Sequence, residues 1–188
     1  MGKVTWKPGT MLYPLPVAMV SCGTLSKSNI ITIAWTGIVN SQPPMTYVSI
    51  RPERHSYRII KESGEFVINL TTERLVRNAD FCGVRSGREF NKFSLPGLTP
   101  VGASSVSAPM IYESPVNIEC KVRSSTLLGS HEMFVAEIVA VNVDDRLLDS
   151  KGVLHLERAS LVCLVHGKYT ALGRQLGCFG YSVKKNQR

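Results

Sequence analysis

The chain lacks any hydrophobic run long enough to cross a membrane. A membrane-spanning helix needs about 20 consecutive apolar residues, and no stretch of the 188-residue sequence approaches that length. The first ten residues, MGKVTWKPGT, also lack the apolar segment that a secretory signal peptide requires. These absences predict a cytoplasmic protein with no membrane partner.

Paired cysteines and the common catalytic motifs are missing as well. The five cysteines form no C-x-x-C pair and their number is odd, which argues against a disulfide framework and a zinc site. Cys120 and Cys163 lie in strand-like apolar runs and are predicted to be small buried hydrophobic residues. No G-x-S-x-G elbow, P-loop, H-E-x-x-H or G-x-G-x-x-G motif occurs. Neither a bound metal nor a stored NAD is expected, so any electron transfer would need another bound cofactor.

Aromatic residues are scarce, at 7% of the chain, although the formal net charge is +8. The basic residues are scattered, apart from a cluster at residues 51–58 and a short tail at residues 184–188. Nucleic-acid-binding proteins usually concentrate charge on one face and interleave aromatic side chains for stacking. We therefore expect no nucleic acid as a partner, and attribute the excess charge to an anionic cofactor or anionic substrates.

The hydrophobic and charged fractions, 44% and 19%, are typical of a globular protein, and the length predicts one domain over residues 1–188. Apolar runs predict strands at residues 17–22, 30–35, 45–50, 65–70, 116–123, 133–143 and 161–165. Helices are predicted at residues 56–63, with Ser56 as N-cap and Gly64 as stop, and at residues 73–81. This pattern predicts a mostly β fold, an antiparallel barrel rather than a Rossmann layout.

Three segments carry more specific expectations. Residues 83–115 are rich in Gly, Ser and Pro and predict mainly a loop, with a lid or binding role. Residues 116–123 alternate apolar and polar side chains, which predicts a strand with one solvated face. Residues 133–143 are apolar on both faces except at Glu137, and predict a central strand or a strand at a subunit interface.

Residues 29–56 are the most informative part of the sequence: NIITIAWTGIVNSQPPMTYVSIRPERHS. They predict a strand, a polar loop at Asn40 and Ser41 before a Pro-Pro pair, a second strand, and a basic turn that opens a helix. An apolar wall with hydroxyls and backbone amides, one strand away from Arg51 and His55, suits a ligand that is flat at one end and anionic at the other. A flavin mononucleotide (FMN) has this shape.

The same segment resembles the flavin-binding core of the flavin reductase-like split-barrel flavoproteins, and most closely the flavoredoxin branch. The matching motifs are N-x-x-T-x-A-W from Asn29, N-S-x-P-P from Asn40 and S-I-R-P-x-R-H-S-Y from Ser49. They are followed in the family's order by ESGEFVINL, ADFCGVRSGR, KF, LGSHEMFVAEIVAV and LGRQLGCFGYSV. The resemblance covers nearly the whole chain. It implies an antiparallel, Greek-key-like split β-barrel with a few short helices that binds FMN.

The resemblance also assigns residues to the flavin ring and the ribityl chain. Four residues around the end of the first strand would hold the isoalloxazine ring: Thr32, Ala34, Trp35 and Thr36. A plain buried strand would show the same pattern. Ser49 belongs to the flavin-binding motif at the end of the second strand. Asn40 and Ser41 are candidates for the ribityl hydroxyls, although Asn-Ser before Pro-Pro is also typical of a turn.

The phosphate is assigned to the basic turn. Arg51 offers a planar fork for phosphate oxygens, and His55 and Ser56 lie at the predicted helix start, where unpaired amides attract an anion. A solvated basic turn is the simpler alternative. Lys92 is a further candidate, although a lone lysine in a loop is usually solvated. In the family a Gly-x-His segment stands near the flavin face, so His131 is a substrate-side candidate, unless it is a turn histidine without a role.

The predicted function is electron transfer through bound FMN by a homodimer, with the flavin near the subunit boundary as in the family. NAD(P)H would serve as a transient substrate, or a redox protein as a partner. Two versions remain open: an NAD(P)H:flavin oxidoreductase that releases reduced flavin, and a flavoredoxin that keeps its FMN. A non-enzymatic module that binds flavin or another planar ligand is the alternative from a different class.

Overall fold

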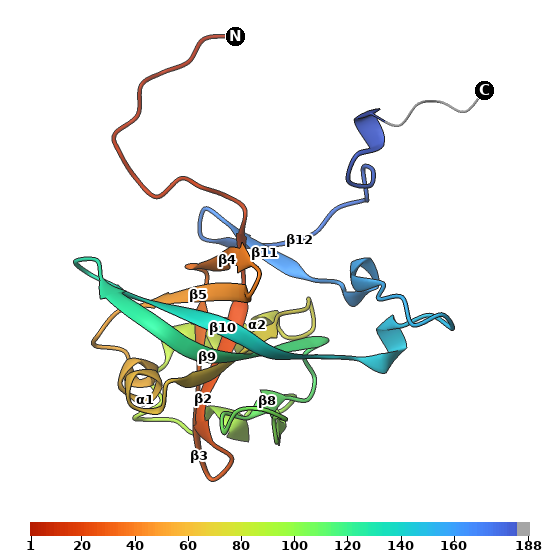
Figure 1. The fold of residues 1–188 in the computed structure, drawn as a ribbon. Helices are drawn as coiled ribbons and strands as arrows, with labels where there is room; N and C mark the ends of the chain where they lie inside the picture. Colours follow the sequence, from red (N-terminus) through yellow and green to blue (C-terminus); the bar gives the residue numbers. More distant parts are fainter. Residues whose placement is uncertain (184–188) are drawn as a thin grey trace.

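A seven-stranded antiparallel sheet forms the body of the protein (Figure 1). The computed structural model describes residues 1–183. The strands lie in the order β3-β2-β6-β9-β10-β5-β4. Their bounds are β2 Ala18–Thr24, β3 Lys27–Ile33, β4 Thr36–Ser41, β5 Pro44–Ile50, β6 Glu65–Leu70, β9 Val116–Leu127 and β10 Glu132–Val143.

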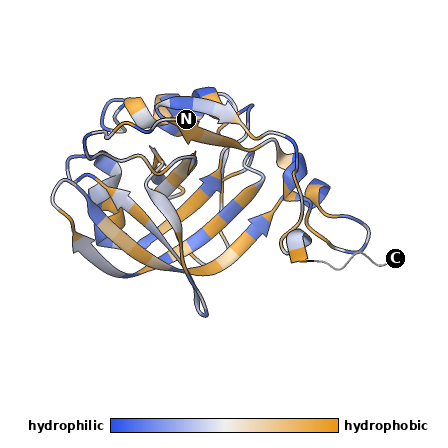
Figure 2. Cartoon of the chain, turned by 90° about the horizontal axis from the view of Figure 1, so that it is seen from above, coloured by the Kyte–Doolittle hydropathy of each residue, from blue (hydrophilic) through white to orange (hydrophobic). Residues whose placement is uncertain are grey.

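The sheet curls into a barrel with two helices packed against it. Figure 2, seen from above, shows hydrophobic and hydrophilic residues alternating along the curved strands, as expected where the two faces of a strand differ in burial. Helix α1 (His55–Ser63) packs its buried Ile60 in the same core as Val20 and Phe66. Helix α2 (Val76–Val84) packs in a second core that includes Met19. Strand β2 therefore supplies alternate residues to two cores, which explains why it is buried on both faces.

Shorter elements complete the fold. A three-stranded sheet joins β1 (Leu15–Pro16), β11 (Val162–Val165) and β12 (Lys168–Ala171), and a small hairpin joins β7 (Pro100–Val101) and β8 (Met110–Ile111). Within the described part of the chain, 3-10 turns lie at Lys92–Ser94, Asp145–Leu147, Leu156–Ala159 and Tyr181–Val183. Among residues 1–183, no helix is long and apolar enough to span a bilayer.

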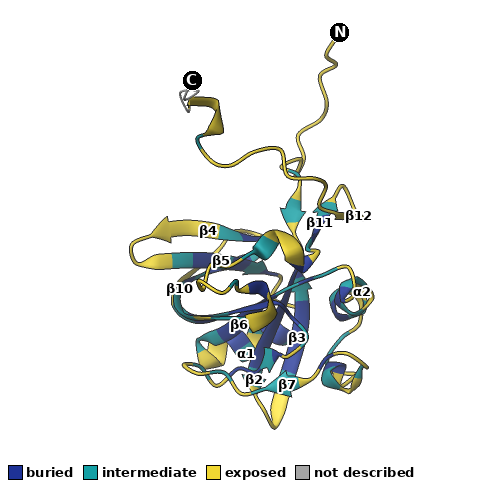
Figure 3. Cartoon of the chain, turned by 90° about the vertical axis from the view of Figure 1, so that its right-hand side faces the viewer, coloured by how far each residue is buried: buried dark blue, intermediate teal, exposed yellow. Residues whose placement is uncertain are grey.

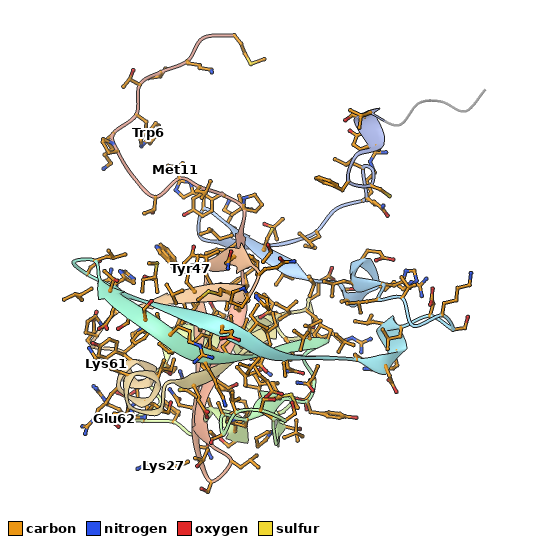
Figure 4. All side chains as sticks on the ribbon, in the orientation of Figure 1. Trp6, Met11, Lys27, Tyr47, Lys61 and Glu62 are labelled. Atoms are coloured by element: carbon orange, nitrogen blue, oxygen red, sulfur yellow. The ribbon has the colours of Figure 1, made fainter. Side chains whose placement is uncertain are left out.

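Both ends of the described chain leave the barrel on the same side (Figures 1 and 3). Residues 1–12 and 172–179 are exposed along their whole length. Figure 4 shows Trp6 far out on the N-terminal arm, while Met11 lies nearer to Tyr47 and the barrel. Trp6 is 76% exposed, so this arm does not contribute to the core of its own barrel.

Several local predictions are confirmed. Gly64 ends α1 in the left-handed conformation, with φ at 68°, which glycine adopts without a steric penalty. Cys120 and Cys163 are buried, and all five cysteines are free thiols. Residues 133–143 lie in β10, which is central because β9 pairs with one edge and β5 with the other.

The structure corrects the prediction at residues 36–41 and at both helix starts. Thr36–Ser41 forms edge strand β4, paired with β5, instead of a polar loop, because an edge strand tolerates polar residues and a proline at the adjacent turn. Arg54, not Ser56, is the N-cap of α1. Helix α2 begins at Val76 rather than at residue 73, since residues 72–75 form a turn closed by a hydrogen bond from Leu75 N to Thr72 O.

The predicted solvated face of residues 116–123 is wrong. Asn117 and Glu119 are buried because the segment before β9 folds over them. The backbone N–H groups of Ser104 and Ser105 donate to the Glu119 carboxylate at 2.9 and 2.6 Å. Asn117 Nδ2 donates to the carbonyl oxygen of Ile111 at 3.0 Å. The polar alternation therefore serves internal hydrogen bonds rather than solvent.

Candidate functional site

Two adjoining hollows lie where strands β3 and β5 end, beside the start of α1 and the end of α2. We call the first, of about 380 Å³, the apolar chamber. It is lined by Val17, Ile31, Thr32, Ile33, Ala34, Trp35, Ser49, Ile50, Arg51, Arg54, Asp80, Gly83, Val84, His131, Leu164 and Tyr169. We call the second, of about 290 Å³, the basic chamber. It is lined by Asn29, Ile31, Glu53, Arg54, His55, Ser56, Cys82, Arg85, Ser86, Gly87, Arg88, Glu89 and Lys92.

Arg54 lies between the two chambers and lines both of them, as does Ile31. Its Nη2 donates a hydrogen bond of 2.6 Å to the carbonyl oxygen of Gly83 near the end of α2. This bond fixes the guanidinium at the junction, where it can face a ligand that spans both hollows. The sequence motif contained Arg54, but nothing in its spacing distinguished it from Arg51.

The wall of the apolar chamber is formed by an aromatic pair and by backbone at the strand ends. The rings of Trp35 and His131 stack with centroids 6.2 Å apart and an interplanar angle of 10°. Ser49 N donates to the carbonyl oxygen of Trp35 at 2.9 Å, which fixes the end of β5 beside the indole. On the other side, the phenolic hydroxyl of Tyr169 donates a hydrogen bond of 3.1 Å to the Asp80 carboxylate, and burial raises the pKa of Tyr169 to about 12. The chamber therefore combines apolar and aromatic walls with a few polar groups, among them Ser49 and Asp80.

The threonine hydroxyls of this region are committed to internal hydrogen bonds. Thr32 Oγ1 donates to the carbonyl oxygen of Ala79 in α2 at 2.5 Å, so towards a ligand it can only accept. Gly83 approaches the same side chain closely, since a Cβ there would lie 3.3 Å from Thr32 Cβ. Thr36 lies outside the chamber and donates its hydroxyl proton to Tyr47 O at 2.5 Å.

Lys92 is the most unusual group in the basic chamber. It is only 3% exposed, and its Nζ donates to the carbonyl oxygens of Ile30 and Cys82 at 2.6 and 2.7 Å. None of the ion pairs within residues 1–183 includes it. Burial lowers its pKa, and the positive charge of Arg54 lowers it further. An ammonium group has three donors, so one N–H is left for a ligand.

The start of α1 forms the second side of the basic chamber. His55 and Ser56 are its first two residues, and N-cap Arg54 makes no side-chain capping bond. Ser56 is buried, and its hydroxyl accepts a hydrogen bond of 2.8 Å from Asn29 Nδ2. Burial, together with the charges of Arg88 and Lys92, lowers the pKa of His55. Unpaired helix amides beside several cations make a site for an anion.

Gly87 closes the basic chamber over Asn29. A Cβ at Gly87 would lie 2.0 Å from Asn29 Oδ1, a distance that no side chain tolerates. Glycine therefore allows the loop of residues 85–89 to lie directly on the amide that holds Ser56. This loop brings Arg85 and Arg88 to the chamber, and neither residue was singled out from the sequence although both lie in the ADFCGVRSGR motif.

The structure brings together most of the residues predicted for the site, in two groups. Those that line the apolar chamber are Thr32, Ala34, Trp35, Ser49, Arg51 and His131. Those that line the basic chamber are His55, Ser56 and Lys92. Thr36, Asn40 and Ser41 line neither chamber. Asn40 is exposed near the end of β4, where its Nδ2 donates to Pro43 O at 3.0 Å.

The two chambers together fit a flavin nucleotide. The apolar chamber offers apolar walls and an aromatic pair against which a flat ring can pack, and the adjoining hollow supplies a buried cation and helix amides for a phosphate. A third hollow of about 490 Å³ lies between the N-terminal segment and Trp35. Its lining is uncharged and consists of Gly9, Thr10, Met11, Leu12, Leu15, Trp35 and Tyr47. In residues 1–183, no group of three or more His, Cys, Asp or Glu side chains is placed to hold a metal ion.

Comparison with known proteins agrees with this chemistry. A family model described as a flavin reductase like domain matches residues 10–171. The flavoredoxin of Desulfovibrio vulgaris (Miyazaki F) is 34% identical, with a TM-score of 0.89 over 97% of this chain and 100% of that chain. A flavoredoxin from Methanosarcina acetivorans is 26% identical, with a TM-score of 0.88 over 98% and 100% of the two chains.

The split-barrel architecture has its own match. A putative flavin reductase with a split barrel domain, from Shewanella frigidimarina NCIMB 400, has a TM-score of 0.78 at 24% identity, over 89% of this chain and 86% of that chain. The predicted mostly β split barrel is thereby confirmed. The predicted coarse function, flavin-based electron transfer by an oxidoreductase, is also confirmed. The chain belongs to the flavin reductase-like family.

Proposed function

We propose that the protein is an FMN-binding electron carrier of the flavoredoxin type, with the isoalloxazine ring in the apolar chamber and the phosphate in the basic chamber. The observation that carries the proposal is the buried cation of Lys92, which has no carboxylate partner among the described residues. A buried charge is costly unless it is paired. A phosphate dianion in the basic chamber would supply the partner.

The assignment of the phosphate rests on two further groups. The amides at the start of α1, at His55 and Ser56, and the guanidinium of Arg54 face the same hollow as Lys92. A phosphate monoester carries a charge of −1.5 to −2 at neutral pH, about as much as two cations neutralise. Arg51 lines the apolar chamber instead and lies 3.6 Å from Glu53. We therefore assign the phosphate to Lys92 and Arg54, with Arg51 nearer to the ring.

The residues of the apolar chamber would orient the ring and exclude water from one of its faces. Bound flavin supplies the electron-transfer chemistry itself, while the protein supplies position and electrostatics. The stacked pair of Trp35 and His131 borders the chamber, and Trp35 is 40% exposed. An electron donor could reach the ring along this open side. We propose NAD(P)H as a transient substrate here, or a redox protein as the partner.

We also propose that the protein acts as a homodimer. Exposed apolar side chains gather on the two terminal segments and on edge strand β4: Trp6, Met11, Leu12, Ile38, Val39, Leu172, Leu176 and Phe179. Such surface is typical of interfaces rather than of monomers, and the uncharged third hollow adjoins it. Residues 133–143 contribute less than their sequence suggests, because Phe134 and Ala136 are buried in their own barrel. The five free thiols fit the reducing cytoplasm proposed as its location.

Anaerobic reduction of the purified protein tests the proposal. The protein is loaded with FMN and passed through a gel-filtration column, and the flavin absorbance of the protein peak is recorded. NADH, NADPH or a reduced ferredoxin is then added. A flavoredoxin retains FMN on the column, loses its flavin absorbance with at least one donor, and regains it with an electron acceptor. FMN that is retained but reduced by none of the donors would support a non-enzymatic binding module instead.

A further inference from the structure

A buried carboxylate joins helix α1 to the strand that follows His131. Glu132 is the first residue of β10 and is only 5% exposed. Its carboxylate accepts hydrogen bonds from Ser125 Oγ at 2.6 Å, Tyr57 Oη at 2.5 Å and Lys61 Nζ at 3.0 Å. These three donors lower the pKa of Glu132 to about 2, so the group is an anion at neutral pH.

Two of the three donors belong to α1, the helix whose first residues line the basic chamber. Tyr57 directly follows Ser56, and Lys61 lies one turn further along the helix (Figure 4). The two donors are themselves connected, since Lys61 Nζ donates to Tyr57 Oη at 2.9 Å. The Tyr57 ring also packs edge-on against Phe134, with centroids 5.7 Å apart. A displacement of the first turn of α1 would therefore be transmitted to Glu132.

Glu132 is joined to the apolar chamber through the backbone, because its neighbour His131 lines that chamber. His131 immediately precedes Glu132, and its ring stacks on Trp35. The carbonyl oxygen of His131 accepts a hydrogen bond of 2.7 Å from Leu128 N, which closes the turn between β9 and β10. The backbone on both sides of the imidazole is thus held, by this turn on one side and by the buried carboxylate on the other.

We propose that Glu132 is a positioning residue that couples anion binding in the basic chamber to the placement of His131 on Trp35. The inference rests on the proposed assignment of phosphate and ring to the two chambers. An anion that binds the amides at His55 and Ser56 fixes the first turn of α1. Tyr57 and Lys61 then hold Glu132, because a buried carboxylate keeps its hydrogen-bond donors. The two ends of the ligand are therefore bound cooperatively.

Riboflavin and inorganic phosphate serve as separate probes of the two chambers. The dissociation constant of riboflavin is measured with and without saturating phosphate, at matched ionic strength. In the wild type we expect phosphate to tighten riboflavin binding by at least about fivefold, the lower end of usual coupling between sites. Linkage requires riboflavin to tighten phosphate binding by the same factor.

Tyr57→Phe is the decisive variant, because it keeps the ring against Phe134 but removes the hydroxyl that donates to Glu132. We expect its coupling factor to fall to about one, and Glu132→Gln, which removes the negative charge, to behave alike if Tyr57→Phe does not fold. Glu62→Gln is the matched control. It removes an exposed ion pair with Arg58 on the same helix, at 2.6 Å, and should keep the wild-type factor.

The emission of Trp35 gives a second readout, recorded in a Trp6→Phe background. Phosphate alone should change this emission in the parent protein and leave it unchanged once Tyr57→Phe is added. A purely structural role for Glu132 would lower stability without altering either signal. This inference is overturned if coupling persists in both Tyr57→Phe and Glu132→Gln. It is also overturned if the wild type binds both probes without coupling, and in either case the proposed function still stands. Failure of the wild type to bind riboflavin overturns the proposed function, and this inference with it.

Discussion

Replacing Lys92 by methionine distinguishes most clearly between binding of the phosphate in the basic chamber and binding of the ring in the apolar chamber. Methionine keeps an unbranched apolar side chain but removes the ammonium group that donates to the carbonyl oxygens of Ile30 and Cys82. A hydrogen bond to a charged group contributes about 1.5 to 3 kcal/mol, so FMN should bind roughly 10- to 150-fold more weakly. Riboflavin has no phosphate, so its affinity should be the same for the variant and the wild type.

The change should not unfold the protein. Two carbonyl oxygens lose a partner at a cost of about 1 to 3 kcal/mol each, and this cost is offset because the desolvation cost of a buried charge, several kcal/mol, is removed. Lys121→Met is the control, because Lys121 is partly exposed beside Glu65 and lies outside both chambers. Calorimetric titration of the three proteins with both ligands is the assay. Equal losses of FMN and riboflavin affinity in Lys92→Met would refute the phosphate assignment.

Three further predictions concern the two chambers and the hydrogen bonds between α1 and Glu132. Gly87→Ala should displace the loop from Asn29, because the new Cβ would lie 2.0 Å from its Oδ1, and should weaken FMN binding in a titration by roughly tenfold, or about 1.4 kcal/mol. Glu132 has a pKa of about 2, below the ordinary 4.5. Its contribution to the free energy of unfolding is therefore present above about pH 4.5 and is lost as the pH falls towards 2, which urea unfolding at a series of pH values measures. Binding of FMN should quench Trp35, while exposed Trp6 contributes little to the change.

Each of these three predictions has a control variant. Gly102→Ala introduces a Cβ no closer than 3.7 Å to its neighbour Leu25, and should leave FMN affinity unchanged. Glu132→Gln should show a smaller loss of stability between pH 4.5 and 2 than the wild type, and an equal loss would contradict the prediction. Trp35→Phe should abolish most of the quenching, so wild-type quenching in this variant would show that another tryptophan reports on the flavin.

Much of the fold could be predicted because its signals are local. The glycine that ends α1 and the buried runs of β2, β6 and β10 depend on neighbouring residues in the sequence. Edge strand β4 could not be predicted in the same way, since Asn40 and Ser41 are typical turn residues and the strand exists only through its pairing with β5. The burial of Glu119 could not be predicted either, because its hydrogen-bond donors, Ser104 and Ser105, lie in a loop with no periodic pattern.

The site was predictable on the ring side and less so on the phosphate side. The residues of the apolar chamber that were predicted are concentrated within residues 32–51, where the motif spacing is visible. The basic chamber combines three separate segments, and Lys92 looks like a solvated loop lysine until Ile30 and Cys82 are brought to it. Asn40 and Ser41 belong to one of the matching motifs, but the hairpin of β4 and β5 places them outside both chambers.

A crystal structure of the FMN complex tests the central claim most directly. The account predicts the phosphate within hydrogen-bond distance of Lys92 Nζ and of the first amides of α1, with the isoalloxazine ring beside Trp35 and His131. A flavin bound with its phosphate away from Lys92, or with its ring outside the apolar chamber, would contradict the account.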